Sequence, residues 1–480
     1  MSYWLARLLF LRALAGIYLV AFLVAVSQFR PLLGERGLLP VPQFVRGRRF
    51  WDAPSVFILR YSDRFFRVLA WTGVALSAIA LVGLPERGPA VLGIVAWLAL
   101  WALYVSILNV GQTFYSFGWE SLLVETGFLA VLLGPARWTT PVLVIWLLRW
   151  LVFRLEFGAG LIKLRGDRCW RDLTCLYYHH ETQPMPSPMS WWFHNLPKPL
   201  HRVEVLANHA AQLVVPFGLF APQPIPDVAG AIIVITQTWL IVSGNFSWLN
   251  FLTITAAISA FDDRFLSALL PLSASASASD APAWHDAMVL ALVVGVAVLS
   301  WWPIRNLMSK HQRMNASFNR LHLVNTYGAF GSITRTRHEI VIEGTDDEMI
   351  TASTVWREYE FKGKPGDVRR RPAQFAPYHL RLDWLMWFAA LSPGYATRWF
   401  DALIVKLLEG DRVTLKLLRH NPFPDAPPRW IRAEFFRYRF TTRPERRESK
   451  AFWVRTPVGD YLPPVQLPVG SRGTASSDWY

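Results

Sequence analysis

The sequence predicts a multispanning helical membrane protein whose C-terminal part is a mixed, strand-containing domain in water. Two observations carry this prediction: the first 305 residues contain repeated apolar runs of membrane-spanning length, and the composition changes beyond about residue 310. Hydrophobic residues make up 53% of the 480 residues, above the ~45–50% of an ordinary soluble domain. Lipid is the environment that accommodates this excess, so the composition excludes a soluble enzyme.

Seven apolar runs are long enough to cross roughly 30 Å of hydrocarbon at about 1.5 Å per residue. They lie at residues 13–29, 68–84, 89–109, 203–221, 228–243, 246–262 and 286–303. Two further apolar segments, 120–134 and 141–164, contain several charged residues, which lipid-facing helices rarely tolerate. We therefore expect these two helices inside the bundle, which would then contain seven to nine helices.

The C-terminal part begins where short stretches mix aromatic, β-branched and charged residues, a composition typical of strands. The expected elements are strands at 333–344, 356–362 and 430–441 and helices at 382–391 and 397–408. We place a transmembrane domain at 1–305, a water-exposed domain at 310–465 and a disordered tail at 466–480. A Ser/Ala/Pro-rich stretch at 273–282 is expected to be a flexible linker before the last span.

The charged residues are spread over loops and helix ends instead of being gathered on one recognition element. The net charge of +15 therefore indicates membrane flanks, with lipid as a partner, and not nucleic-acid binding. The loop between the first two spans contains Arg30, Arg36, Arg46, Arg48, Arg49, Arg60 and Arg64, and the positive-inside rule places such a loop in the cytoplasm. An odd number of spans with the C-terminal domain outside the cytoplasm would instead place this loop outside. The sequence therefore leaves the orientation open.

The helix predicted at 141–164 is the first candidate site. Arg149, Glu156 and Lys163 are spaced seven apart, which places them on nearly one face at intervals of about two turns. One interpretation is structural, with these charges paired to Glu120 and Glu125 of the neighbouring helix. The other is a site, because a lysine removed from water can serve as a general base or bind an anionic group.

The loop at 165–202 and the helix that follows it add further polar groups. His179, His180, Glu181 and His194 have side chains that can ligate a metal, but no helical spacing is known to bring them together, so we predict no metal site. His209 lies in a polar stripe of the next span, which either bonds neighbouring helices or lines the same cavity as Lys163.

Cys169 and Cys175 are the only cysteines, which excludes a disulfide framework and a cysteine-built zinc site. They are close enough in sequence to form one disulfide, and could equally be two buried thiols. Before them, Gly158 and Gly160 allow another helix or a flat ligand to approach closely.

Long motifs, in order, resemble those of the lipase maturation factor family. They are residues 160–167, 169–175, 180–184, 243–250, 325–331, 361–367, 369–372, 376–378, 381–384, 421–424 and 461–464. The resemblance covers about residues 110 to 465. It implies a membrane protein that assists folding and assembly of secreted lipases, with no catalytic residue or cofactor required. In animal members it implies the endoplasmic reticulum membrane with a luminal C-terminal domain; in a bacterial host, which the Ala/Arg-rich composition suggests, it implies the inner membrane.

The leading functional interpretation is therefore a chaperone-like maturation factor that binds client proteins such as lipases through its C-terminal domain. Aromatic and Arg residues usually anchor such contacts. The candidates are Arg369, Arg370, Arg371, Phe435, Phe436 and Tyr438. The alternative for these positions is ordinary strand packing and a solvated charge run.

The runner-up interpretation is an enzyme. The stretch from 159 to 164 also resembles the membrane domain of vitamin K-dependent gamma-carboxylase, in which the lysine matching Lys163 is the base in quinone-linked chemistry. This resemblance implies a quinone- or lipid-linked oxidoreductase or carboxylase, with Lys163, Glu156, Glu125 and His209 lining an intramembrane cavity and quinone as its cofactor. If these groups converge on an apolar pocket, the enzyme interpretation gains.

Overall fold

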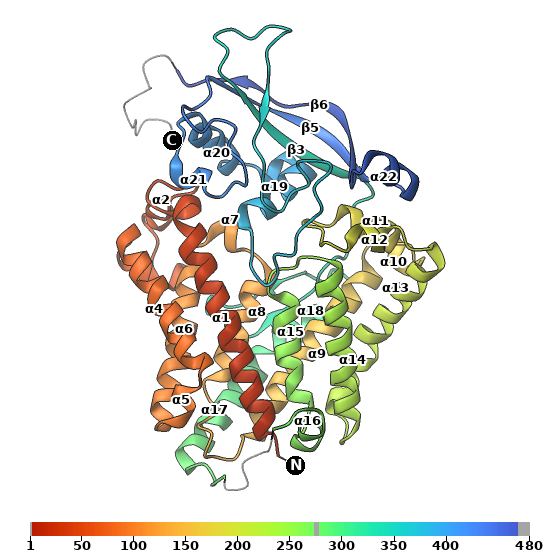
Figure 1. Ribbon diagram of the computed structural model, residues 1–480. Helices are drawn as coiled ribbons and strands as arrows, with labels where there is room; N and C mark the ends of the chain where they lie inside the picture. Colours follow the sequence, from red (N-terminus) through yellow and green to blue (C-terminus); the bar gives the residue numbers. More distant parts are fainter. Residues whose placement is uncertain (1, 273–277, 469–480) are drawn as a thin grey trace.

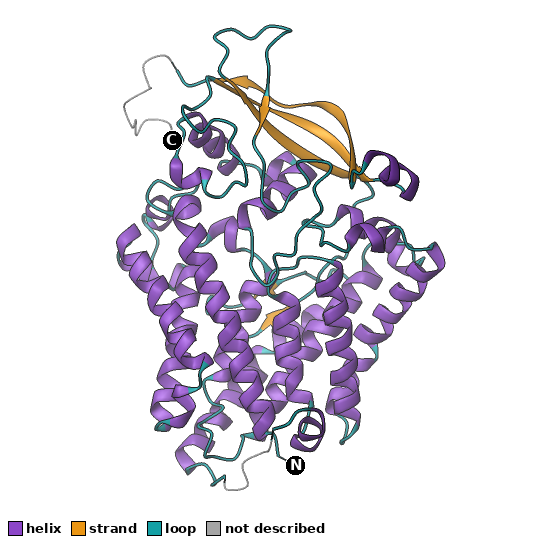
Figure 2. Ribbon diagram, viewed as in Figure 1, coloured by secondary structure: helices purple, strands orange, loops and turns teal. Residues whose placement is uncertain are grey.

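The computed structural model describes residues 2–272 and 278–468. A bundle of helices forms most of the molecule, and an antiparallel sheet with short helices lies at the end of the bundle opposite the N-terminus (Figures 1 and 2). This arrangement confirms the predicted fold class. Residues 273–277 of the expected linker and 469–480 of the expected tail lie outside the described residues.

Six helices among the described residues are long and apolar enough to cross a membrane. They are α1 (Trp4–Leu33), α4 (Asp63–Leu81), α6 (Ala90–Val110), α13 with η2 (Lys198–Leu213 and Val215–Phe220), α14 (Ile225–Ser243) and α17 with α18 (Ala283–Leu299 and Trp301–Met308). On α6, large apolar side chains such as Val91, Leu92 and Val95 are more than half exposed, as expected for a helix in contact with lipid.

The run at 246–262 differs from its prediction. Only α15 (Leu249–Ala257) and η3 (Ile258–Ala260) are helical there, which is too short to count as a full span. The helix begins late because the chain first turns through Ser247, whose φ is +55°. It ends early because Asp262 caps the next helix by accepting the N–H of Phe265 at 2.9 Å.

The two charged helices lie inside the bundle, as the sequence predicts. They are α8 (Gly118–Ala130) and α9 (Val142–Arg165), and both appear at the centre of Figure 1. Arg154 forms a buried ion pair with Glu125, whereas Arg149 donates to backbone oxygens, among them that of Leu219 at 3.1 Å. The structural interpretation, in which Arg149, Glu156 and Lys163 pair with Glu120 and Glu125, is therefore wrong in its partners. Glu125 is paired with Arg154, and Glu120 is paired with Arg381 of the C-terminal domain.

The C-terminal sheet has the strand order β4-β3-β5-β6, with all neighbours antiparallel. Its strands are β4 (Arg357–Glu358), β3 (Arg337–Thr345), β5 (Trp430–Phe440) and β6 (Trp453–Val465). The predicted strand at 356–362 is shorter than expected, and β6 was not predicted because Gly459 and its prolines weaken the strand signal. The predicted helices are present as α19 (Arg381–Leu391) and α20 (Trp399–Leu408), between the sheet and the bundle (Figure 1).

Residues 309–336, here called the returning segment, run from α18 back into the bundle before reaching the sheet. Figure 2 shows the short strands β1 (Ala316–Ser317) and β2 (Asn325–Thr326) among the helices. Glu125 accepts the backbone N–H of Asn325 at 2.9 Å, and the Asn325 carbonyl accepts from Arg154 at 2.5 Å. Irregular backbone is tolerated at this depth because the surrounding protein satisfies its polar groups.

Buried polar contacts also join α19 to the bundle. Arg381 donates to Glu120 at 2.8 Å, and both side chains are fully buried. Gln28 of α1 accepts the backbone N–H of Arg381 at 3.0 Å and donates to the carbonyl of His379 at 2.6 Å. The C-terminal domain is therefore anchored to the bundle by buried hydrogen bonds as well as by apolar contact.

Candidate functional site

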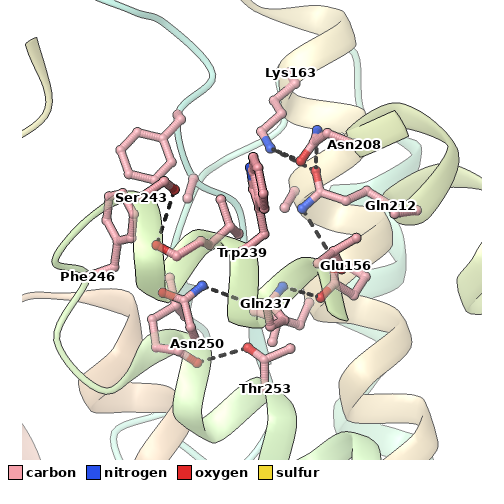
Figure 3. Close-up of a pocket in the computed structure, with 18 of the residues that line it drawn as sticks. Glu156, Lys163, Asn208, Gln212, Gln237, Trp239, Ser243, Phe246, Asn250 and Thr253 are labelled. Atoms are coloured by element: carbon pink, nitrogen blue, oxygen red, sulfur yellow. Dashed lines mark hydrogen bonds between the residues drawn. The ribbon is translucent and has the colours of Figure 1, made fainter. Parts of the chain in front are cut away.

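An apolar cavity of about 290 Å³ lies where α9, α13, α14 and α15 meet (Figure 3). Its walls include Trp239 of α14, Phe246 before α15 and Phe330 of the returning segment. The size is close to the lower end of the range for small-molecule sites, and such sites combine apolar walls with a few placed polar groups. The polar groups of this cavity form one connected row.

Lys163 of α9 is the cationic end of that row. Its ammonium donates to the side-chain oxygens of Gln212 at 2.8 Å and Asn208 at 3.2 Å, both on α13. The same nitrogen lies 4.9 Å from the centre of the Trp170 ring. The lysine is therefore held by dipoles and a ring face, without a direct carboxylate partner.

Glu156 is the anionic centre of the row, two turns before Lys163 on α9. Gln212 donates to one of its oxygens at 3.2 Å, and Gln237 of α14 donates to the other at 2.6 Å. Asn250 of α15 then donates to Gln237 at 2.6 Å. All these groups are buried, and Figure 3 shows how three amide side chains link four helices around the cavity.

The four residues of the enzyme hypothesis divide into two pairs. Lys163 and Glu156 line the cavity. Glu125 is instead bound to Arg154 and to Tyr327, whose hydroxyl donates to it at 2.7 Å. His209 lies with a ring nitrogen 3.0 Å from the backbone oxygen of Trp170, and is not among the cavity-lining residues.

Two residues of the polar row were missed from the sequence, Gln237 and Asn250. Each is a single amide in an apolar helix, a weak signal that a search for polar groups within predicted spans would have found.

The predicted client-binding residues are partly unavailable at the surface. Phe436 is 8% exposed and Tyr438 1% exposed, because both pack under the sheet in a cluster with Trp453. Arg370 is paired with Glu360 at 3.0 Å. This corrects the expectation that all six residues lie on an exposed surface: strand packing accounts for Phe436 and Tyr438, and an ion pair accounts for Arg370.

Arg369 and Arg371 remain exposed, and Phe435 is half-buried. The Arg371 guanidinium lies 4.6 Å from the centre of the Trp192 ring and donates to the carbonyl of Pro188 at 3.1 Å. Arg371 therefore lies where the C-terminal domain meets the loop at 165–202.

Cys169 and Cys175 are joined by a disulfide, with a Cα–Cα distance of 4.8 Å. Both are buried beside Trp170 and Val205, at the end of the bundle that carries the C-terminal domain (Figure 1). Gly158, one of the small residues that precede Lys163 on α9, is also tightly packed. A Cβ there would lie 2.5 Å from the backbone oxygen of Tyr327.

Two histidines of the loop at 165–202 are neutral near pH 7. Burial and the charge of Lys163 lower the pKa of His179 to about 4, and the ring packs against Phe330. Burial likewise lowers the pKa of His194 to about 4, beside Glu181 at 3.5 Å. Each of these histidines therefore acts as an uncharged packing group.

Comparison with known proteins gives the same family for both parts of the chain. The model of the lipase maturation factor transmembrane domain matches residues 5–268, and that of the lipase maturation factor C-terminal domain matches residues 323–463. Lipase maturation factor 1 of Bos taurus is 44% identical, over 97% of this chain and 89% of its own length. Lipase maturation factor 1 of Homo sapiens is 43% identical, over 97% and 88%. Lipase maturation factor 2 of Xenopus tropicalis is 30% identical, over 96% and 82%. No solved structure matches.

Proposed function

Because the chain belongs to the lipase maturation factor family, we propose that it assists lipases to fold and assemble at the membrane face that carries its C-terminal domain. The main support for this proposal is the similarity to lipase maturation factor 1 over 97% of the chain, which implies a role in lipase maturation. Both domains are included in that match, so the role belongs to the joined molecule.

The client surface that we propose is formed by Arg369, Arg371, Trp192 and Met189. The first two and Met189 are exposed, and Arg371 is held over the Trp192 ring by a cation–π contact. Arg and aromatic side chains supply much of the energy of protein contacts, because they combine apolar area with directed hydrogen bonds. A surface built from both domains also explains why the two occur in one chain.

The test is co-expression with a lipase in cells that lack their own family member, followed by activity and mass of the secreted lipase. We expect the chain to raise lipase activity per unit of secreted lipase, and the double substitution Arg369→Ala with Arg371→Ala to reduce this gain. The matched control is Arg437→Ala, which removes an exposed arginine from β5, outside the proposed surface. Equal lipase activity in both variants would contradict the surface, whereas no gain with the unaltered chain would contradict the role.

We also propose that the C-terminal domain faces an oxidising compartment: the endoplasmic reticulum lumen in a eukaryote, or the periplasm from the inner membrane of a bacterium. The disulfide at this end of the bundle supports that orientation, because disulfides persist in such compartments. The arginines of the first loop oppose it: this loop ends beside the C-terminal domain, and the positive-inside rule would place it in the cytoplasm (Figure 1).

A thiol-labelling experiment decides the orientation. Because the two native cysteines are bonded to each other, Ser353→Cys in the exposed loop after β3 would introduce one free thiol. The matched control is Asp280→Cys, an exposed position three residues before α17, which lies at the opposite end of the bundle (Figure 1). In intact cells or sealed vesicles of known orientation, a membrane-impermeant maleimide should label only one of them. Labelling of Asp280→Cys from the oxidising side would reverse our assignment.

A second candidate function follows from the cavity at Lys163. An apolar cavity with one lysine and one glutamate on its wall suits a quinone- or lipid-like ligand with a polar head. Mass spectrometry of protein purified from native membranes tests this, in the unaltered chain and in Lys163→Ala. A quinone present in equal amount to the protein and lost in Lys163→Ala would favour the enzyme. Secreted hydrolases retained equally in both, without quinone, would favour the maturation factor alone.

A further inference from the structure

We propose that His180, His201 and Glu204 form a site for a divalent transition metal, with Zn²⁺ as the expected ion. His180 lies on α11 (Leu176–Thr182), and the other two lie one turn apart near the start of α13. The site adjoins the cavity, since His180 and Glu204 both line it. Neither the family similarity nor the sequence prediction includes a metal here.

The geometry of the three side chains is the first argument. One ligand atom from each residue can be chosen so that all lie within 4.8 Å of one another. The Glu204 oxygen Oε2 is 4.0 Å from Nε2 of His180 and 3.7 Å from Nδ1 of His201. Ligands of tetrahedral zinc, with bonds of about 2.0–2.2 Å, lie about 3.4 Å apart. Side-chain rotations that shorten these separations by roughly 0.3 to 1.4 Å would therefore bring the three atoms onto one ion.

The burial of the imidazoles is the second argument. His180 and His201 are each 1% exposed, and among the described residues no ring nitrogen of either has a hydrogen-bond partner. The distances to Glu204 are too long for hydrogen bonds, which end near about 3.2 Å for nitrogen donors. Buried polar groups in native proteins almost always have partners. A bound cation would use Nε2 of His180 and Nδ1 of His201 and neutralise the Glu204 carboxylate.

The environment of Glu204 is the third argument. Its second oxygen, Oε1, accepts a hydrogen bond of 2.6 Å from the indole nitrogen of Trp239 on α14. This contact fixes the carboxylate with Oε2 directed at the two histidines. Metal-binding carboxylates are typically oriented in this way by a second hydrogen-bonded group.

The donor set indicates the kind of ion and its state. Two imidazoles and one carboxylate suit Zn²⁺, whereas Ca²⁺ and Mg²⁺ prefer oxygen ligands throughout. Three protein ligands leave one position of a tetrahedral ion open, and the adjoining cavity can supply a water or a polar group of a ligand to that position. The site would also cross-link α11 to α13, and so hold the loop at 165–202 against the bundle.

The test uses the full chain purified in detergent with an affinity tag that contains no histidine. Metal content after removal of loosely bound ions is measured by plasma mass spectrometry, and the metal-free protein is titrated with Co²⁺, whose absorption reports tetrahedral binding. We expect about one zinc per chain, and a Co²⁺ spectrum that saturates at one equivalent. The ion should be lost in Glu204→Gln and in His201→Gln.

Two matched variants make the result specific. His194→Gln removes a half-buried histidine of the same loop region that is outside the three-residue group, and it should retain the ion. Trp239→Phe leaves all three ligands in place but removes the hydrogen bond to Glu204, and it should weaken metal binding by about 10–100-fold.

The proposal is overturned by any of three results: no saturable Co²⁺ or Zn²⁺ binding by the unaltered chain, equal metal content in Glu204→Gln, or loss of metal in His194→Gln alone. If Glu204→Gln or His201→Gln fails to fold, the Co²⁺ titration of the unaltered chain and of Trp239→Phe decides the question without them.

Discussion

The buried ion pair between Glu120 and Arg381 makes the strongest prediction about how the two domains are joined. Arg381, the first residue of α19, donates to Glu120 at 2.8 Å and to the carbonyl of Phe114 at 2.7 Å. Its guanidinium also lies 3.4 Å from the centre of the Tyr115 ring. Arg381→Met removes these contacts and leaves Glu120 buried, with the hydroxyl of Tyr104 at 2.6 Å as a remaining donor.

Breaking a fully buried ion pair by removing one partner costs about 3–5 kcal/mol. The unfolding entropy is about 2.1 cal/mol/K per residue, so for a chain of 480 residues that unfolds as one unit each kcal/mol lowers the midpoint by about 1 °C. Arg381→Met should therefore lower the midpoint by roughly 3–5 °C. Thermal unfolding of the detergent-solubilised chain, followed by tryptophan fluorescence, measures this midpoint. The matched control is Arg437→Met, which replaces an exposed arginine of β5 and should unfold within about 0.5 °C of the unaltered chain.

A double-mutant cycle separates the ion pair from the loss of packing. Glu120→Gln alone should also destabilise the chain, because it leaves Arg381 buried without its carboxylate. The combination of Glu120→Gln with Arg381→Met should recover part of the loss, since no uncompensated charge remains. A midpoint for Arg381→Met equal to that of Arg437→Met would contradict a stabilising ion pair. Additive effects of Glu120→Gln and Arg381→Met in the double variant would contradict it as well.

Three further predictions concern stability. Gly158→Ala should lower the free energy of unfolding by about 1–3 kcal/mol, because the new methyl group meets a backbone oxygen at 2.5 Å. Gly295→Ala, with open space around it, should not lower it, and the thermal unfolding midpoints of the two variants give the comparison. Reducing agent should destabilise the unaltered chain by about 2 kcal/mol, the chain-entropy value for so short a loop, but should not affect the variant with Ala at both Cys169 and Cys175. Burial lowers the pKa of Lys364 to about 8 although a glutamate lies nearby, so between about pH 8 and 10.5 the unfolded chain binds more protons. Stability measured against Lys364→Met should therefore rise with pH in that window, by up to about 1.4 kcal/mol per unit, and a flat difference would contradict the burial argument.

Local patterns in the sequence predicted the helices well. Apolar length located the spans, and the charges at 120–134 and 141–164 correctly indicated helices away from lipid, because a charge in lipid has no partner. A full span was predicted at 246–262, and the shortness of α15 was missed because the turn at Ser247 lies in an otherwise apolar run. Strand β6 was missed for the related reason that its prolines and glycine are common in loops, and only the pairing with β5 makes it a strand.

The candidate site could be predicted only where its residues share a helix. The spacing of seven placed Glu156 and Lys163 on one face of α9, and both line the cavity. His209 was predicted to join them as part of a polar stripe with Asn208 and Gln212. Asn208 and Gln212, four residues apart, do reach the cavity, but His209 points about 100° away from Asn208 and does not line it. The partner of Glu120 was not predictable, because Arg381 is 261 residues away and no local pattern reports such a contact.

The buried charges also bear on whether the C-terminal domain can act alone. Glu125 and Arg154 of the bundle are bonded to Asn325 of the returning segment, and Glu120 is bonded to Arg381 of α19. Removing the chain beyond α18 would leave three charged side chains in the bundle without partners that they have in the intact molecule. Glu120 would lose its ion pair with Arg381, at a cost of about 3–5 kcal/mol. Glu125 and Arg154 would stay paired with each other but would lose hydrogen bonds to Asn325, worth about 1.5–3 kcal/mol each. Together these losses are comparable to the whole stability of a domain. Neither domain is therefore expected to keep its native structure when separated from the other.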